Sequence, residues 1–288
     1  MKFGIMAPYQ MAPLEEGEYA VAFARLAEEL EFESVWVVDH VVMCPKYESR
    51  YPYDPSGRSP FDADVVQPDP LVWLSYVAAA TRRIQLATGI LILPQRNPVV
   101  LAKTLASLDR LSGGRLLLGT GVGWVREEAE AVGTRFSDRG RRADEAIEAM
   151  RVLWREPLSS YHGEFVRFDG VVSRPKPVRP GGPPIIVGGH SRAAARRAGR
   201  LGDGYYPLGV VGDELASRCD LMAETARAHG RDPAAIELTC LGTLDAASAG
   251  ACAERGVDRM LVSSPTGDLK ALRPALEKFR DEVIRRFA

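Results

Sequence analysis

Cysteine is scarce in this chain, and long apolar runs are missing. The four cysteines, Cys44, Cys219, Cys240 and Cys252, show no C-x-x-C spacing, which argues against a disulfide framework and a zinc knuckle. We therefore expect reduced thiols and a cytoplasmic location. No apolar run approaches the roughly 18 residues of a membrane span. Because Met1–Ile5 already has the pattern of a strand, no signal peptide is expected.

An excess of charge of either sign is also missing. The sequence has 37 Lys and Arg against 38 Asp and Glu, a formal net charge of -1, which gives no general attraction to nucleic acid or anionic lipid. The histidines lack ligand spacing such as H-x-x-x-H, so we predict no metal site. No repeat, linker or composition shift divides the chain, so a single domain over residues 1–288 is expected.

The chain does contain a regular alternation of short apolar strands and helical segments. Strands are predicted at Phe3–Ala7, Val35–Val38, Ile84–Leu93, Leu116–Leu118, Pro184–Val187, Gly204–Pro207, Ile236–Leu241 and Arg259–Val262. Helices are predicted at 19–30, 70–81, 98–112, 139–155, 192–201, 212–229, 246–255 and 269–287. Eight strand–helix units predict an α/β fold of the (β/α)8 TIM barrel type. A doubly wound open sheet shares this alternation and is the alternative.

Two insertions interrupt the alternation, after the second and the fourth strands. Residues 45–68 are rich in Pro, Asp and Tyr and predict a long loop, which is more often a functional lid than filler. After the fourth strand, Tyr161–Phe168 predicts a hairpin. The basic cluster Arg139–Arg142 precedes Asp144 and Glu145, and we interpret it as a solvated helix face with surface ion pairs.

The fourth strand ends in glycines and a large aromatic. Leu116–Leu118 runs into Gly119, Gly121 and Gly123, and Trp124 follows. Glycine lets a flat ligand approach the backbone, and the carboxyl ends of parallel strands are where ligands bind. We therefore predict a site for a planar cofactor or substrate here. A dinucleotide fingerprint is the weaker alternative, because the spacing is G-x-G-x-G rather than G-x-G-x-x-G.

The second and third strands also end or break at candidate site residues. Asp39 and His40 directly follow the second strand. A histidine there can donate a hydrogen bond, move a proton or line a cofactor, while the aspartate holds an amide or orients a neighbour. An Asx turn that only closes the strand is the alternative. Gly89, within the third strand, indicates a bulge or a packing glycine.

A glycine-rich turn, Gly188-Gly189-His190-Ser191, follows the fifth strand and begins a helix. Exposed amides at a helix start bind anions, so we expect the amides of Gly189, His190 and Ser191 to point at a phosphate. A tight strand-to-helix turn is the alternative. Phosphate sites of barrels are more frequent after strands seven and eight.

The order and spacing of several motifs resemble the bacterial luciferase-like monooxygenase superfamily, and within it the F420-dependent oxidoreductases. The motifs are V-W-V-V-D-H at 35–40, L-A-T-G-I-L at 86–91, R-N-P at 96–98, G-R-L-L-L-G-T-G-V-G-W at 114–124, P-I-I-V-G-G-H-S at 184–191 and G-D-G at 202–204. The resemblance implies the same barrel. It also implies a cis peptide at Gly89–Ile90 that supports a flavin or deazaflavin ring, and a catalytic role for His40.

The resemblance further implies that residues 188–191 bind the cofactor phosphate. The expected cofactor site comprises Asp39, Gly89, Ile90, Gly121, Gly123, Trp124, Gly188, Gly189, His190 and Ser191. In the branch that oxidises sugar phosphates, a catalytic Glu occupies the loop after strand four, where this chain has Trp124. A sugar-phosphate substrate is therefore disfavoured.

We predict an oxidoreductase that transfers hydride between coenzyme F420 and a small organic substrate, with FMN-dependent monooxygenation as the alternative. F420 is favoured because the Arg- and Ala-rich, Lys-poor composition indicates a high-GC source, and such bacteria often make it. A barrel hydrolase or lyase that uses Asp39 and His40 as acid and base is an alternative of another class. A non-catalytic cofactor-binding barrel is a further one.

A homodimer is also expected. The segment 70–81 has more apolar residues than one face of a barrel helix requires, namely Leu71, Val72, Trp73, Leu74, Tyr76 and Val77. Together with Leu101–Leu111 it predicts a two-fold interface of the kind that the resembled family forms.

Overall fold

Eight parallel strands form a closed barrel in this computed structural model, which describes residues 1–287. The barrel strands are β1 (Lys2–Met6), β2 (Ser34–Val37), β3 (Gln85–Thr88), β5 (Leu116–Gly121), β8 (Ile185–Gly188), β9 (Gly204–Tyr206), β10 (Glu237–Gly242) and β11 (Arg259–Ser263). They pair in the order β3-β2-β1-β11-β10-β9-β8-β5, and the pairing of β5 with β3 closes the ring. The predicted (β/α)8 barrel is confirmed, and the open sheet is wrong.

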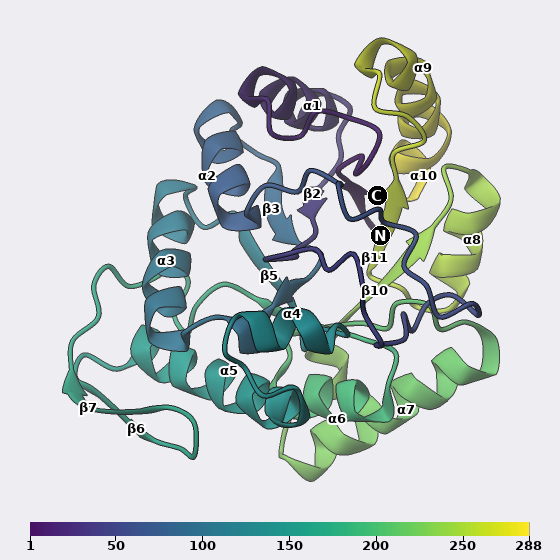
Figure 1. Cartoon of the computed structure of the whole chain (residues 1–288). Coiled ribbons are helices and arrows are strands. Elements are labelled where there is room, and N and C mark those ends of the chain that lie inside the picture. The colour runs from purple at the N-terminus through teal and green to yellow at the C-terminus, as the bar shows by residue number, and fades with distance from the viewer. Residues whose placement is uncertain (288) are drawn as a thin grey trace.

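Helices surround the strands in a ring (Figure 1). They are α1 (Gly17–Glu29), α2 (Pro70–Ala80), α3 (Pro98–Leu111), α5 (Arg139–Arg155), α6 (Arg192–Leu201), α7 (Gly212–Ala228), α8 (Ala246–Glu254) and α9 (Leu269–Phe279). Side chains of Asp69, Asn97 and Ser191 cap the first turns of α2, α3 and α6, which satisfies amides that have no partner within the helix. Short 3-10 turns cover Leu93–Gln95 and Pro233–Ala235.

The predicted continuous helix over 269–287 is wrong in its last part. The chain widens into a π-helical turn at Arg280–Ile284 before α10 (Arg285–Phe287). Val283 and Ile284 are both buried there, and the wider turn lets these two successive side chains reach the core.

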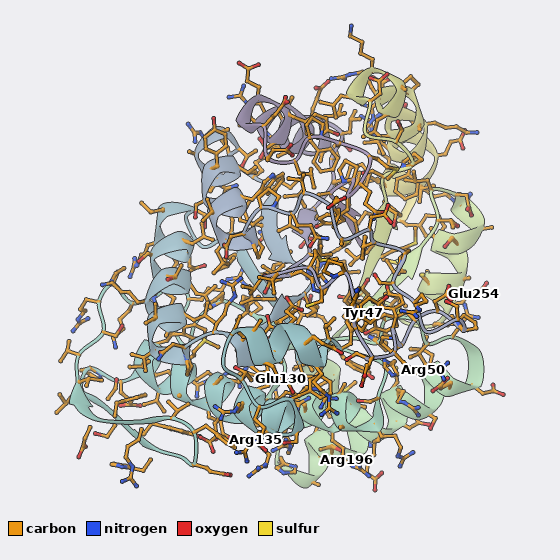
Figure 2. The ribbon with its side chains drawn as sticks, viewed as in Figure 1. Tyr47, Arg50, Glu130, Arg135, Arg196 and Glu254 are labelled. Atoms are coloured by element: carbon orange, nitrogen blue, oxygen red, sulfur yellow. The ribbon has the colours of Figure 1, made fainter. Side chains whose placement is uncertain are left out.

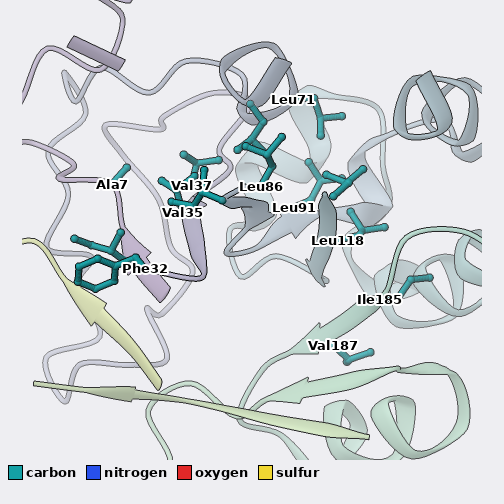
Figure 3. Packing of buried hydrophobic residues seen from close by; sticks show 14 of the residues in the cluster. Ala7, Phe32, Val35, Val37, Leu71, Leu86, Leu91, Leu118, Ile185 and Val187 are labelled. Carbon is teal, nitrogen blue, oxygen red and sulfur yellow. The ribbon is translucent and has the colours of Figure 1, made fainter. Parts of the chain in front are cut away.

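Successive side chains on the strands enter two separate cores. Outward-facing residues pack against the helices, and Figure 3 shows part of this layer: Val35, Val37, Leu86, Leu118, Ile185 and Val187. Inward-facing residues form a smaller cluster inside the barrel: Trp36, Ala87, Leu117, Ile186, Tyr206 and Leu261. Since side chains alternate along a strand, strands buried on both faces have the continuous apolar runs seen in the sequence.

Trp36 is the largest side chain inside the barrel and is completely buried. Its indole Nε1 donates to Ser34 Oγ at 2.7 Å. A Cβ atom at Gly4 would lie 2.7 Å from Trp36, and one at Gly89 would lie 2.9 Å from it, which is closer than carbon atoms pack. Glycine at these positions therefore makes room for the indole.

The third strand is divided, whereas a single strand over Ile84–Leu93 was expected. β3 ends at Thr88, the peptide Gly89–Ile90 is cis, and β4 (Leu91–Ile92) then pairs with β5. The expected cis peptide at this position is confirmed. The Gly89 amide still donates to Val37 O of β2 at 2.6 Å, and the ladder is interrupted after this bond until Leu91.

Both predicted insertions are present. The long loop after β2, dark blue in Figure 1, crosses the front of the barrel. After β5 the chain forms α4 (Arg126–Ala131), a 3-10 turn (Phe136–Asp138) and then α5. The hairpin of β6 (Ser159–His162) and β7 (Arg167–Val171) follows and stands away from the barrel in Figure 1.

The apolar residues of α2 divide between the core and the surface. Leu71, Trp73, Leu74 and Val77 are buried in the outer core, whereas Val72 and Tyr76 are exposed, as are Val99, Val100 and Leu111 of α3. Burial of the first group leaves a smaller apolar surface than the sequence indicates, and the homodimer stays a prediction. Within residues 1–287, every helix is too short or too polar to cross a membrane.

We expect Trp36→Ala to lower the free energy of unfolding by about 3–5 kcal/mol, because the deletion leaves a cavity in the middle of the barrel. Trp124→Ala is the matched control. Trp124 lies partly exposed at the barrel mouth, so its loss should cost about 1 kcal/mol. Urea unfolding of both variants measures the difference, and equal losses would contradict the role of Trp36 as the central packing residue.

Candidate cofactor-binding active site

A cavity of about 920 Å³ opens at the carboxyl ends of the barrel strands. This volume lies near the upper end of the roughly 300–1,000 Å³ typical of ligand pockets. Every site residue predicted from the sequence lines it: Asp39, His40, Gly89, Ile90, Gly121, Gly123, Trp124, Gly188, Gly189, His190 and Ser191. The fold therefore gathers four separate strand ends around one space.

The floor of the cavity is built around Ile90. A Cβ atom at Gly121 would lie 2.6 Å from Ile90 Cδ1, and one at Gly188 would lie 2.7 Å from Ile90 Cγ2. The two glycines thus accommodate the Ile90 side chain, which presents an apolar surface to the cavity. Such a surface suits one face of a flat ring.

At one end of the cavity, His40 forms a pair with a residue that the sequence analysis missed. His40 Nδ1 lies 3.0 Å from Glu128 Oε2, and Glu128 Oε1 accepts from the amide of Val41 at 2.7 Å. The Glu128 side chain is fully buried and that of His40 is 11% exposed. Because an ionised carboxylate only accepts hydrogen bonds, Nδ1 carries the proton and Nε2 remains for a ligand.

Asp39 forms hydrogen bonds with residues other than the partner of His40. Its carboxylate accepts from Ile92 N and from Arg96 Nη2, both at 2.8 Å, and Arg96 also reaches Asp69 at 3.0 Å. Burial raises the pKa of Asp39, and the Arg96 guanidinium opposes that rise. The expectation that Asp39 holds an amide is confirmed, and its contacts fix the chain that follows the Gly89–Ile90 bulge.

The glycine-rich turn at 188–191 lies at the other end of the cavity. The expectation that the Gly189 amide points at a phosphate is wrong. The Gly189 amide donates to Tyr206 O at 3.0 Å, because pairing of β8 with β9 continues to this residue. The Ser191 hydroxyl accepts from Ala194 N at 3.1 Å and caps α6. His190 Nδ1 is buried without a partner in the described chain, and burial lowers its pKa.

The interpretation of residues 139–142 as a solvated face is correct for Arg141 and wrong for Arg139. Arg141 pairs with Asp138 and Glu164 at the surface. Arg139 lines the cavity because it begins α5 beside the barrel mouth, with its guanidinium 3.7 Å from the centre of the Phe136 ring.

Arg139 is poorly neutralised by its surroundings. Its Nε is buried without a partner in residues 1–287. Burial lowers its pKa, and the charges of Arg126 and Arg197 lower it further. Arg197 is balanced by Asp144, whereas the side-chain partner found for Arg139 in residues 1–287 is the neutral Phe136 carbonyl, which accepts from Nη1 at 2.9 Å. Arg139 thus supplies an unsatisfied charged donor that suits an anion, and the unpartnered Nδ1 of His190 adds a second donor in the tautomer that carries its proton there.

Comparison with known proteins gives sequence matches along the whole chain. The profile of the luciferase-like monooxygenases matches residues 1–286. An uncharacterized protein of Mycobacterium tuberculosis is 34% identical over 220 residues, 76% of this chain and 77% of its own. An F420-dependent glucose-6-phosphate dehydrogenase of Kineococcus radiotolerans is 34% identical over 236 residues, 80% of this chain and 63% of that protein. An FMNH(2)-dependent dimethylsulfone monooxygenase of Pseudomonas putida is 34% identical over 155 residues, 53% and 42% of the two chains.

Solved structures share the fold. A monooxygenase from Streptomyces bottropensis matches with a TM-score of 0.78 and 24% identity over 100% of both chains. An F420-dependent secondary alcohol dehydrogenase in complex with an F420-acetone adduct matches with a TM-score of 0.76 and 19% identity over 98% of both chains. At these identities the likeness concerns the barrel alone.

We expect neutral His40 to carry its proton on Nδ1 because Glu128 accepts there. Glu128→Gln keeps an acceptor and should preserve this tautomer. Glu128→Leu removes it, should mix the two tautomers, and leaves the Val41 amide unpartnered at a cost of about 1–3 kcal/mol. Long-range proton–nitrogen correlation spectra distinguish the tautomers. A proton on Nε2 in the parent protein would contradict the arrangement.

Proposed function

Because the chain belongs to the luciferase-like monooxygenase family, we propose that its barrel mouth binds a flavin-type cofactor and works as an oxidoreductase on a small organic molecule. The observation that supports this most strongly is that a single cavity joins three features. They are the apolar floor at Ile90, the unsatisfied cationic end at Arg139 and the His40–Glu128 pair.

The residues present fit a flavin-type group. A flat ring matches the Ile90 surface between Gly121 and Gly188. A phosphate matches the other end, where Arg139 Nε and His190 Nδ1 are buried without a partner among residues 1–287. Unpaired buried donors are costly, so an anion at this point would stabilise the protein as well as fix the cofactor.

F420 is the proposed cofactor and FMN is the alternative. Sequence similarity to an F420-dependent dehydrogenase and to an FMNH(2)-dependent monooxygenase supports the pair without separating its members. When bound, F420 supplies hydride transfer to or from a substrate, whereas FMN adds oxygen activation; the protein's part is binding, orientation and exclusion of competing reactions.

His40 is the proposed catalytic residue. His40 lines the cavity, and its contact with Glu128 through Nδ1 holds the ring in one orientation and leaves Nε2 for a ligand. The imidazole can therefore hold or accept one proton at Nε2 as the substrate changes its oxidation state, and Glu128 stabilises the imidazolium that results. The long loop covers this end of the cavity and limits the access of water.

The alternative of a hydrolase or lyase finds less support. It requires Asp39 to act with His40, but the Asp39 carboxylate is engaged by Arg96 and the Ile92 amide, and His40 has Glu128 as its partner. A non-catalytic barrel would bind the cofactor and show no turnover, which the two experiments below separate.

Replacement of Arg139 tests the cofactor site. Parallel titrations with F420, FMN and FAD should show submicromolar to micromolar binding of F420 or FMN by the parent. Arg139→Met should weaken that binding about tenfold to a hundredfold, because a charge-assisted bond is worth about 1.5–3 kcal/mol. Arg141→Met, on the solvent side of the same helix, should leave the affinity unchanged. Binding of none of the three by the parent would refute the proposal.

Replacement of His40 tests catalysis once the cofactor is known. His40→Ala should lower turnover about 10²–10⁴-fold, the usual worth of positioned proton transfer, with cofactor affinity within about twofold of the parent. His40→Gln keeps a hydrogen-bond donor but cannot titrate. Recovery of the rate by Gln would assign His40 to orientation rather than proton transfer, and unchanged turnover in both variants would remove it from the reaction.

A further inference from the structure

A row of aromatic rings crosses the cavity on the side of the long loop. It begins at His40, whose ring centre lies 6.4 Å from that of Trp124, and continues through Tyr51 at 5.1 Å from Trp124. Tyr53 lies 5.4 Å from Tyr51, and His190 ends the row 5.3 Å from Tyr53. All these contacts are edge-to-face, which is a favourable arrangement for aromatic pairs. We call Tyr47, Tyr51, Tyr53 and Trp124 the aromatic roof.

Polar contacts fasten the loop that carries the three tyrosines of the aromatic roof. Glu127 of α4 accepts from the Glu48 amide at 2.6 Å and from Ser49 Oγ at 2.9 Å, and the Arg126 amide donates to Ser49 Oγ at 2.9 Å. Tyr47 itself lies 5.3 Å from Trp124, and Figure 2 shows it on the loop in front of the barrel strands. The roof is thus held in place before a ligand enters, which lowers the cost of binding.

The aromatic roof borders the cavity between the His40 end and the proposed phosphate end, where Tyr53 meets His190. Tyr51, Tyr53 and Trp124 line the same 920 Å³ cavity as Ile90. Since Ile90 forms the floor and the tyrosines belong to the covering loop, the cavity offers two apolar surfaces, and its volume leaves room for a second flat molecule beside a cofactor ring.

The charges around the cavity disfavour a cationic guest. Arg50, Arg126 and Arg139 line it beside one exposed carboxylate, that of Glu48, and the buried carboxylates of Asp39 and Glu128 are already engaged. An aromatic cage for a cation needs the opposite balance. Neither the Tyr51 nor the Tyr53 hydroxyl has a hydrogen-bond partner in the described chain, and burial raises the pKa of Tyr53 to about 12, so its phenol keeps a proton to donate.

We propose that the aromatic roof is the substrate subsite, and that the substrate is a planar aromatic molecule without positive charge that carries a hydroxyl or carbonyl oxygen. The inference rests on the proposed function, because it takes the floor at Ile90 and the end at Arg139 to belong to the cofactor. Tyr51 and Tyr53 are then specificity-determining residues through ring stacking and hydrogen bonding to that oxygen.

The test compares naphthol with its saturated counterpart decahydronaphthol and with the cation naphthylmethylamine, by equilibrium dialysis against the full chain. The parent should bind naphthol at least about tenfold more tightly than either other probe. Tyr51→Leu and Tyr53→Leu should each weaken naphthol binding about 2- to 10-fold, which is the worth of an aromatic pair, and change decahydronaphthol by less than about twofold. Tyr76→Leu, on the outer face of α2, is the matched control and should change neither.

Circular dichroism and thermal unfolding establish that each variant is folded. Equal binding of naphthol and decahydronaphthol, or equal loss of both in the tyrosine variants, would overturn the proposal, since either shows an apolar site without preference for rings. Displacement of naphthol by saturating FMN or F420 would also overturn it, because the probe would then occupy the cofactor position. Selective naphthol binding by a protein that binds neither FMN nor F420 would support the subsite and refute the proposed cofactor instead.

Discussion

The position of the Trp36 indole constrains the rest of the structure. It occupies the centre of the barrel, with Gly4 of β1 and Gly89 after β3 in direct contact and the Tyr206 ring of β9 with its centre 6.1 Å away. A close-packed barrel tolerates one such side chain only where neighbouring strands have none. Gly89 leaves room for the indole at the point where the third strand divides, and Ile90, which follows it, forms the floor of the cavity.

Above this floor, the candidate site residues come from segments that are far apart in the sequence. The pair of His40 and Glu128 joins the end of β2 to α4, and Glu127 in the same helix fastens the covering loop. Two adjacent glutamates thus control separate functions, one the orientation of the candidate catalytic imidazole and the other the placement of the aromatic roof. The proposed anion-binding end is assembled in the same way, from the turn after β8 and the first residue of α5.

Much of this organisation is predictable from the sequence. Barrel strands buried on both faces produce continuous apolar runs, and strong caps such as Asn97-Pro98 fix helix starts, so the eight units and both insertions are confirmed. Site residues that come directly after strands, such as Asp39 and Gly188, are also found at the expected end of the barrel.

The residues that the sequence analysis missed depend on contacts between distant segments. Glu128 has the pattern of an ordinary acidic first turn, and only its contact with His40, 88 positions earlier, reveals its role. Arg139 lies in a basic cluster in which Arg141 faces solvent and Arg142 packs over the Phe165 ring. The sequence did offer one indication that Arg139 lies near the site, because it is the first residue of a helix predicted after the glycine-rich strand. The engaged amide of Gly189 depends on pairing with β9, which local turn chemistry does not specify.

A crystal structure of the protein saturated with F420, and separately with FMN, tests the central claim most directly. The account predicts electron density for one of the two cofactors inside the barrel mouth, with its ring against Ile90 and a phosphate against Arg139 and the turn at 188–191. Density for the phosphate at the His40 end, or for the ring outside the barrel mouth, would contradict the assignment of the two ends of the cavity.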